Sequence, residues 1–110
     1  MAFMKLISVD RCPPGAGVFV PFRDLELAVF HLTGPTRFIV IDNACPHAGA
    51  NLSGGCLEGT IVECPWHQWR FDLDRAVCIE SDRARLTRYP TEIRNGDLYF
   101  DPDAVPWSDT

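Results

Sequence analysis

Two segments decide the fold of this chain: DNACPHAGANLSGG at residues 42–55 and CPWHQWRFDL at residues 64–73. Each segment carries one cysteine and one histidine close together. These four candidate ligands are Cys45, His47, Cys64 and His67. Two thiolates and two imidazoles are the donors of an asymmetric [2Fe–2S] cluster, in which imidazoles replace thiolates on one of the two irons. The pattern therefore predicts a one-electron carrier.

The same four donors also suit a tetrahedral zinc site. Zinc sites commonly take their cysteines from one loop and their histidines from another, whereas each segment here contributes one of each. The cluster is therefore favoured, but a zinc-stabilised interaction module without redox activity stays open from the residues alone. Iron and acid-labile sulfide in the purified protein would distinguish the two.

Beyond the ligands, the two segments resemble the Rieske family, and a looser similarity runs over about residues 3–101. The resemblance implies an all-β fold in which an antiparallel β-sandwich base carries a small cluster-binding β subdomain. It places a Rieske domain at residues 1–101, the cluster-binding part at about residues 43–73, and a tail at residues 102–110. It also implies one [2Fe–2S] cluster per chain, held by Cys45, His47, Cys64 and His67.

Periodicity predicts an all-β chain independently, because short apolar stretches alternate with turn residues about every 8–12 positions. Asn95-Gly96 is a strong hairpin signal. No segment shows a convincing helical period. The expected strands are residues 3–9, 17–22, 25–32, 37–42, 60–64, 69–73, 76–79, 86–94 and 97–101.

Composition restricts the possible partners. The 110 residues carry a formal charge of −5, which argues against nucleic acid as a partner and favours a basic docking surface on a protein partner.

No stretch approaches the ~20 apolar residues of a membrane span, and the N-terminus lacks a secretory signal. We therefore expect a soluble, cytoplasmic protein. Cys12, Cys56 and Cys78 are expected to be small buried hydrophobic residues.

Three functions fit these features. The first is a ferredoxin that passes electrons from a flavin-dependent or NAD(P)H-dependent reductase to a terminal oxygenase. The second is the small subunit of a nicotinamide-dependent nitrite reductase, which would pair with a large subunit. The third is the zinc module. A complete oxygenase is excluded, because its mononuclear iron needs two further histidines and a carboxylate, and only His31 remains.

By the same resemblance, high-potential members have a disulfide between the two loops, where this chain has Ala50 and Trp66. They also have serine and tyrosine hydroxyls near sulfur, where this chain has Trp69 and Phe71. If each missing hydrogen bond is worth ~1.5–3 kcal/mol, the loss is roughly 60–130 mV per bond. We expect a midpoint potential below zero.

Several side chains near the ligands have two possible roles. Leu52, Trp66, Trp69 and Phe71 would supply an apolar shield on one side of a cluster, although Trp69 and Phe71 could instead be strand residues of the core.

The charged residues that follow are expected to be solvated. These are the carboxylates Asp72 and Asp74, which could also take part in docking, and the arginines Arg83, Arg85 and Arg88, which could contact an acidic partner.

Overall fold

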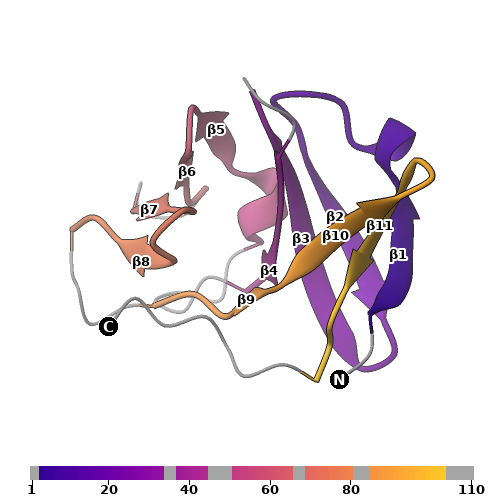
Figure 1. Ribbon diagram of the computed structural model, residues 1–110. Coiled ribbons are helices and arrows are strands. Elements are labelled where there is room, and N and C mark those ends of the chain that lie inside the picture. The colour runs from indigo at the N-terminus through magenta and orange to yellow at the C-terminus, as the bar shows by residue number, and fades with distance from the viewer. Residues whose placement is uncertain (1–2, 34–36, 45–50, 66–68, 81–84, 104–110) are drawn as a thin grey trace.

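The computed structural model describes residues 3–33, 37–44, 51–65, 69–80 and 85–103. Within these ranges the chain forms strands and two short 3-10 helices, at Val9–Arg11 (η1) and Leu52–Gly54 (η2), and no α-helix (Figure 1). The expectation of an all-β protein is confirmed. No helix in the described part of the chain is long and apolar enough to cross a membrane.

The strands form three sheets in which every pair is antiparallel. The first sheet has the order Met4–Ser8 (β1), Asp97–Phe100 (β11) and Thr91–Arg94 (β10). The second has the order Gly17–Phe22 (β2), Leu25–Leu32 (β3), Arg37–Asp42 (β4) and Arg88–Tyr89 (β9). The third has the order Cys56–Glu58 (β5), Ile61–Glu63 (β6), Arg70–Asp72 (β7) and Val77–Cys78 (β8).

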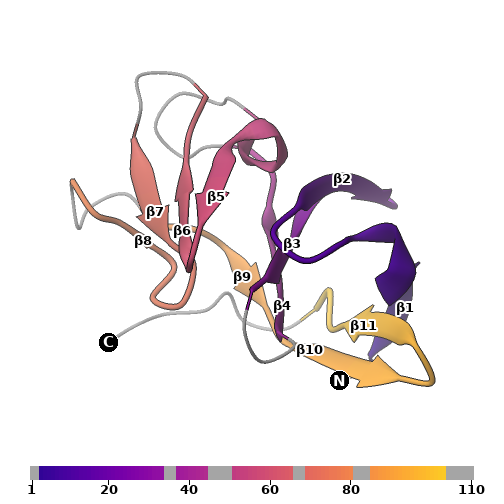
Figure 2. The ribbon, with the colours of Figure 1, turned by 90° about the horizontal axis from the view of Figure 1, so that it is seen from above.

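The second sheet lies between the other two, as Figure 2 shows. Successive side chains of a strand point to opposite faces of the sheet, and β3 and β4 bury side chains on both of their faces. One face packs with the first sheet in a core that contains Leu27, Val29, Phe38, Val40, Leu98 and Phe100. The opposite face packs with the third sheet in a core that contains Ala28, Phe30, Ile39, Ile41, Leu52, Val62 and Phe71. The first two sheets are the sandwich base, and the third sheet is seated on it.

Strands 17–22, 25–32 and 37–42 have the bounds that the sequence predicts. The single strand expected at residues 86–94 is wrong. Pro90 divides it into β9, which pairs with β4, and β10, which pairs with β11. Proline has no backbone N–H to donate to a ladder, and the carbonyl of Pro90 instead accepts a hydrogen bond from the Asp101 backbone N–H at 3.2 Å.

Arg88 connects the base to the third sheet. Its Nη1 donates to the carbonyl oxygens of Leu73 and Asp74, at 3.2 and 2.8 Å, in the turn between β7 and β8. Asp74 in turn pairs with Arg37 on β4 at 2.8 Å. The expectation that Arg88 is a solvated charge is therefore wrong, because this half-buried guanidinium donates to two backbone carbonyls of the turn.

Candidate functional site

Cys64 is the one predicted ligand that lies among the described residues. It follows β6 directly and is 1% exposed. Its backbone N–H donates to the carbonyl of Trp69 at 2.6 Å, immediately beyond the last β6–β7 pair, Glu63 with Arg70. This bond closes the base of the second ligand segment, and we call such a hydrogen-bonded base a neck. From here on, the first ligand segment means residues 45–50 and the second means residues 64–68. His67 lies outside the described residues.

The first ligand segment has a closed neck as well. Ala44 and Asn51 form an isolated antiparallel bridge, and the backbone N–H of Leu52 donates to the carbonyl of Asn43 at 2.8 Å. Cys45 and His47 belong to the stretch between the bridged residues and fall outside the described part of the chain. Both predicted ligand segments therefore leave and rejoin the fold at hydrogen-bonded necks.

Gly55 brings the two necks together. A methyl group at this position would lie 2.2 Å from the carbonyl oxygen of Glu63, the residue before Cys64. Only glycine permits so close an approach of two backbones. Leu52, from the first neck, and Cys64, from the second, also share the core under the third sheet.

The surroundings of Cys64 fit a ligand of a metal cluster. Cys64 lies in an apolar core, where a bare thiolate would be costly because buried charge needs a compensating partner. Thiolate is also the soft ligand that iron–sulfur clusters select. A buried cysteine at the neck of a short hairpin can therefore hold an iron, and the apolar surroundings would keep water from it.

The aromatic residues after the second segment belong to the core. Phe71 is fully buried and Trp69 is half-buried against the same cluster of side chains. The two residues share a face, as strand alternation predicts. Leu52 is likewise fully buried. The described structure thus places Trp69 and Phe71 in the core, in a cluster of side chains that also contains Cys64. A shielding role stays a prediction, and Trp66 lies outside the described residues.

Asn43 is a site residue that sequence reasoning missed. It is 1% exposed, and its side chain bonds to both Asn51 and Ser53 beyond the first ligand segment. The sequence offered one signal, which was its position. A polar amide directly follows the apolar strand β4, and if buried there it needs hydrogen-bond partners for its polar atoms. Asp42, one residue earlier, accepts a hydrogen bond at 2.7 Å from the Tyr89 hydroxyl.

The remaining cysteines differ from one another. Cys12 and Cys78 are buried as expected, whereas Cys56 is exposed and the expectation for it is wrong. Cys56 begins the edge strand β5, where Leu57 takes the inward position and packs on the core. Burial raises the pKa of the Cys12 thiol above its ordinary value. Nδ1 of His31 lies 2.8 Å from the Cys12 carbonyl oxygen, consistent with a structural role.

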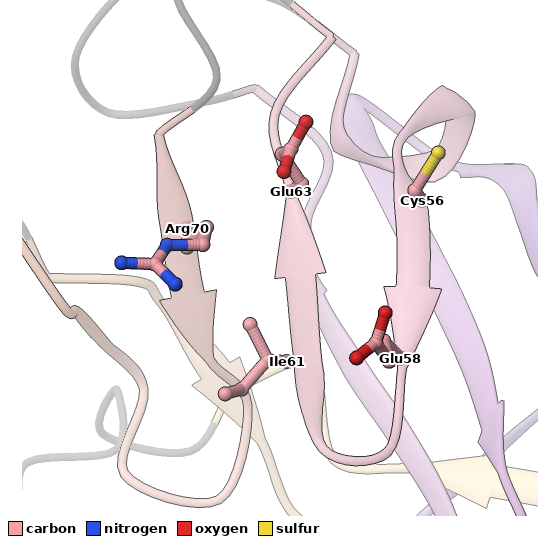
Figure 3. A pocket seen from close by; sticks show the side chains of 5 residues that line it. All are labelled: Cys56, Glu58, Ile61, Glu63 and Arg70. Carbon is pink, nitrogen blue, oxygen red and sulfur yellow. The ribbon is translucent and has the colours of Figure 1, made fainter.

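A shallow hollow of about 220 Å³ lies on the outer face of the third sheet, and Figure 3 shows the side chains that line it. Its lining residues are Cys56, Glu58, Ile61, Glu63 and Arg70. Arg70 pairs with Glu80 at 2.8 Å, which raises the pKa of Arg70. The Arg70 backbone N–H also donates to Glu80 at 2.9 Å, and this bond together with the side-chain pairing lowers the pKa of Glu80. The hollow contains no buried charge and lies outside the predicted ligand set.

Comparison with known proteins gives a consistent result. A family model described as the Rieske [2Fe-2S] domain matches residues 2–90. The ferredoxin component of a naphthalene 1,2-dioxygenase system from Pseudomonas putida is 39% identical over 101 residues, which are 90% of this chain and 94% of that protein.

Two solved structures have the same fold. The Sphingomonas yanoikuyae B1 ferredoxin superimposes with a TM-score of 0.81 at 30% identity and covers 91% of this chain and 98% of its own. A putative NADH-dependent nitrite reductase small subunit from Mycobacterium tuberculosis gives 0.83 at 25% identity, over 94% of this chain and 97% of its own.

Proposed function

Because the chain belongs to the Rieske [2Fe–2S] domain family, we propose that it is a ferredoxin component of an oxygenase system. It accepts single electrons from a flavin-dependent or NAD(P)H-dependent reductase and delivers them to a terminal oxygenase. The observation that carries this proposal is the match to a dioxygenase ferredoxin component over 94% of that protein's length. The acidic charge of −5 suits a basic docking surface on such partners.

We assign Cys45, His47, Cys64 and His67 as the ligands of one [2Fe–2S] cluster. When bound, this group supplies a centre that takes up and releases one electron. The burial of Cys64 and the two closed necks support the assignment. The buried side chains Leu52 and Phe71 exclude water beneath the necks, and Gly55 holds one neck against the other.

We further assign residues 1–101 to the Rieske domain, about 43–73 to its cluster-binding part and 102–110 to a tail. The third sheet supports this division of the domain, and its last strand, β8, continues it to Cys78. We propose a cytoplasmic location because the cysteines outside the ligand set, Cys12, Cys56 and Cys78, are expected to be reduced.

Metal analysis and a coupled assay test the proposal. The purified protein should contain iron and acid-labile sulfide, and the reduced protein should give an electron paramagnetic resonance signal. With NADH and the reductase and oxygenase of the Pseudomonas putida naphthalene system, it should support product formation or, at least, accept electrons from the reductase. Stoichiometric zinc without sulfide would instead establish the zinc module.

Substitution of one histidine tests the ligand assignment. His67→Cys should retain a cluster but lower its midpoint potential, because a thiolate adds negative charge to the first coordination shell. The wild-type potential is expected below zero, toward the lower end of the ~−150 to +300 mV range of Rieske centres. An unchanged potential in the variant would remove His67 from the ligand set.

The nitrite reductase small subunit remains a second candidate, and a TM-score of 0.83 to such a subunit favours it. The two functions differ in their partner. Affinity capture from the native cells should recover either a terminal oxygenase with its reductase or a large nitrite reductase subunit. Recovery of the large subunit would replace the oxygenase partner in the proposal and leave the ligand assignment as it is.

A further inference from the structure

A buried amide stands between the sandwich base and the first ligand segment. Asn43 follows β4 and is one of two buried polar side chains among the described residues, with Asp101. Burial of an amide is unfavourable unless its polar atoms are hydrogen-bonded. The partners of Asn43 therefore indicate what the residue does.

All four polar groups of Asn43 are used. Its backbone N–H donates to the carbonyl of Glu26 on β3, and its own carbonyl accepts from the Leu52 backbone N–H, both at 2.8 Å. Its side-chain Oδ1 accepts from the Ser53 backbone N–H at 2.9 Å, and its Nδ2 donates to Oδ1 of Asn51 at 2.8 Å. Because a backbone N–H can only donate, the amide oxygen must face Ser53 and the amide nitrogen must face Asn51.

These bonds tie both ends of the first ligand segment to one residue. Asn43 precedes the segment, and its partners at residues 51, 52 and 53 follow it. Two residues beyond Ser53, Gly55 lies against the carbonyl of Glu63. A continuous set of fixed contacts therefore runs from β3, through Asn43, to the residue that precedes Cys64.

We propose that Asn43 is a positioning residue that fixes the placement of Cys45 and His47 relative to Cys64. The inference rests on the proposed function, since it concerns the ligands assigned there. An uncharged side chain that accepts and donates at once is required. Aspartate would lose the donor and add a negative charge beside the thiolate ligands, and alanine would remove both bonds.

Two variants and one control separate positioning from general stability. Asn43→Ala removes both side-chain bonds. Asn51→Ala removes only the bond that Nδ2 of Asn43 donates, and it does so by changing an exposed residue. Leu98→Ala, the control, opens a cavity in the core between the first two sheets, on the far side of β3 and β4. All three are purified with their cluster.

The readouts are the g values and midpoint potential of the cluster, its rate of loss below the unfolding temperature, and deuterium uptake by a peptide containing residues 51–55. In Asn43→Ala we expect altered g values, a shifted potential, faster deuterium uptake, and cluster loss about tenfold faster, because two hydrogen bonds are lost. In Asn51→Ala the same four readouts should change in the same direction, but by smaller amounts. Leu98→Ala should keep the wild-type g values and potential even though it unfolds at a lower temperature.

Wild-type g values and potential in Asn43→Ala would overturn the inference, as would an equal shift in Leu98→Ala. If Asn43→Ala does not fold, Asn51→Ala decides, and wild-type behaviour in that variant overturns the inference too. A wild-type protein without iron and sulfide would instead overturn the proposed function. The two failures are therefore distinguishable.

Discussion

Alanine at Gly55 should separate the two ligand necks, whereas alanine at Gly54 should not. At Gly55 the added methyl carbon would lie 2.2 Å from the Glu63 carbonyl oxygen, 0.8 Å inside the 3.0 Å limit below which such contacts essentially never occur. Glu63 pairs with both Cys56 and Arg70, so its carbonyl cannot turn away without disturbing the sheet. The strand or the neck must move instead.

The cost follows from this displacement. Overpacking of a well-packed site typically costs about 1–3 kcal/mol. For a domain of this size the unfolding temperature falls by about 4 °C per kcal/mol, so Gly55→Ala should unfold roughly 4–12 °C below the wild type. Gly55 has a φ of −79°, which alanine also adopts. The contact alone, and no backbone strain, accounts for the loss.

The adjacent residue provides the control. Among the described residues, and apart from the neighbouring backbone of its own helix, no atom lies within 4 Å of a methyl group at Gly54. Replacing glycine by alanine in a compatible conformation stabilises a protein by about 0.4–1 kcal/mol. Gly54→Ala should therefore unfold at the same temperature as the wild type or slightly above it. The same chemical change at neighbouring positions thus gives opposite results.

The assay is loss of the visible cluster absorption and of far-ultraviolet dichroism on heating, at one heating rate because cluster loss makes unfolding irreversible. In Gly55→Ala the cluster should be lost earlier, since the displaced Glu63 precedes the assigned ligand Cys64. If Gly55→Ala and Gly54→Ala behave alike, the close approach of the two necks is refuted.

Four further substitutions test the supports around the site. Leu52→Ala should lower the free energy of unfolding by about 2–5 kcal/mol because it empties a fully buried position, and Leu57→Ala, at a half-buried position, should cost less; chemical denaturation measures both. Burial and the hydrogen bond to Asp42 raise the pKa of Tyr89, so wild-type stability should fall as the pH rises above about 10. Tyr89→Phe should lack that fall in stability, which denaturation series at pH 8–11 measure. An identical pH dependence in the two proteins would contradict this reasoning. Arg88→Met should increase deuterium uptake in the turn between β7 and β8 without changing uptake in β1. Equal protection of that turn in the variant and the wild type would show that the two hydrogen bonds from Arg88 are dispensable.

Local signals were sufficient for the strands that begin and end at strong turns. The run at residues 25–32 follows a turn at Arg23, whose φ of 55° marks a tight reversal, and its bounds match the prediction. The division at Pro90 was not predictable in the same way. It depends on which strands pair across the molecule, and a pattern of apolar residues carries no information on partners.

The candidate site shows the same limit. Its donors were named from the paired cysteine and histidine pattern and from the resemblance to the Rieske family, and of the four only Cys64, buried directly after β6, lies among the described residues. The necks were not foreseen, because Gly55 meets Glu63 through the pairing of β5 with β6, in which Cys56 lies opposite Glu63. Strand β5 was missed for a related reason. Its three residues are too few to show alternation and are recognised only by their pairing with β6.

The double burial of β3 and β4 gives the site its rigidity. A strand with apolar partners on both faces cannot shift toward either core without losing packing, so the end of β4 is a fixed point from which Asn43 extends. The second neck reaches the same core through Cys64 and Phe71. An electron carrier benefits from such an arrangement, because transfer is fast only when the ligands move little between redox states. The base therefore contributes to function by holding the two necks in one arrangement.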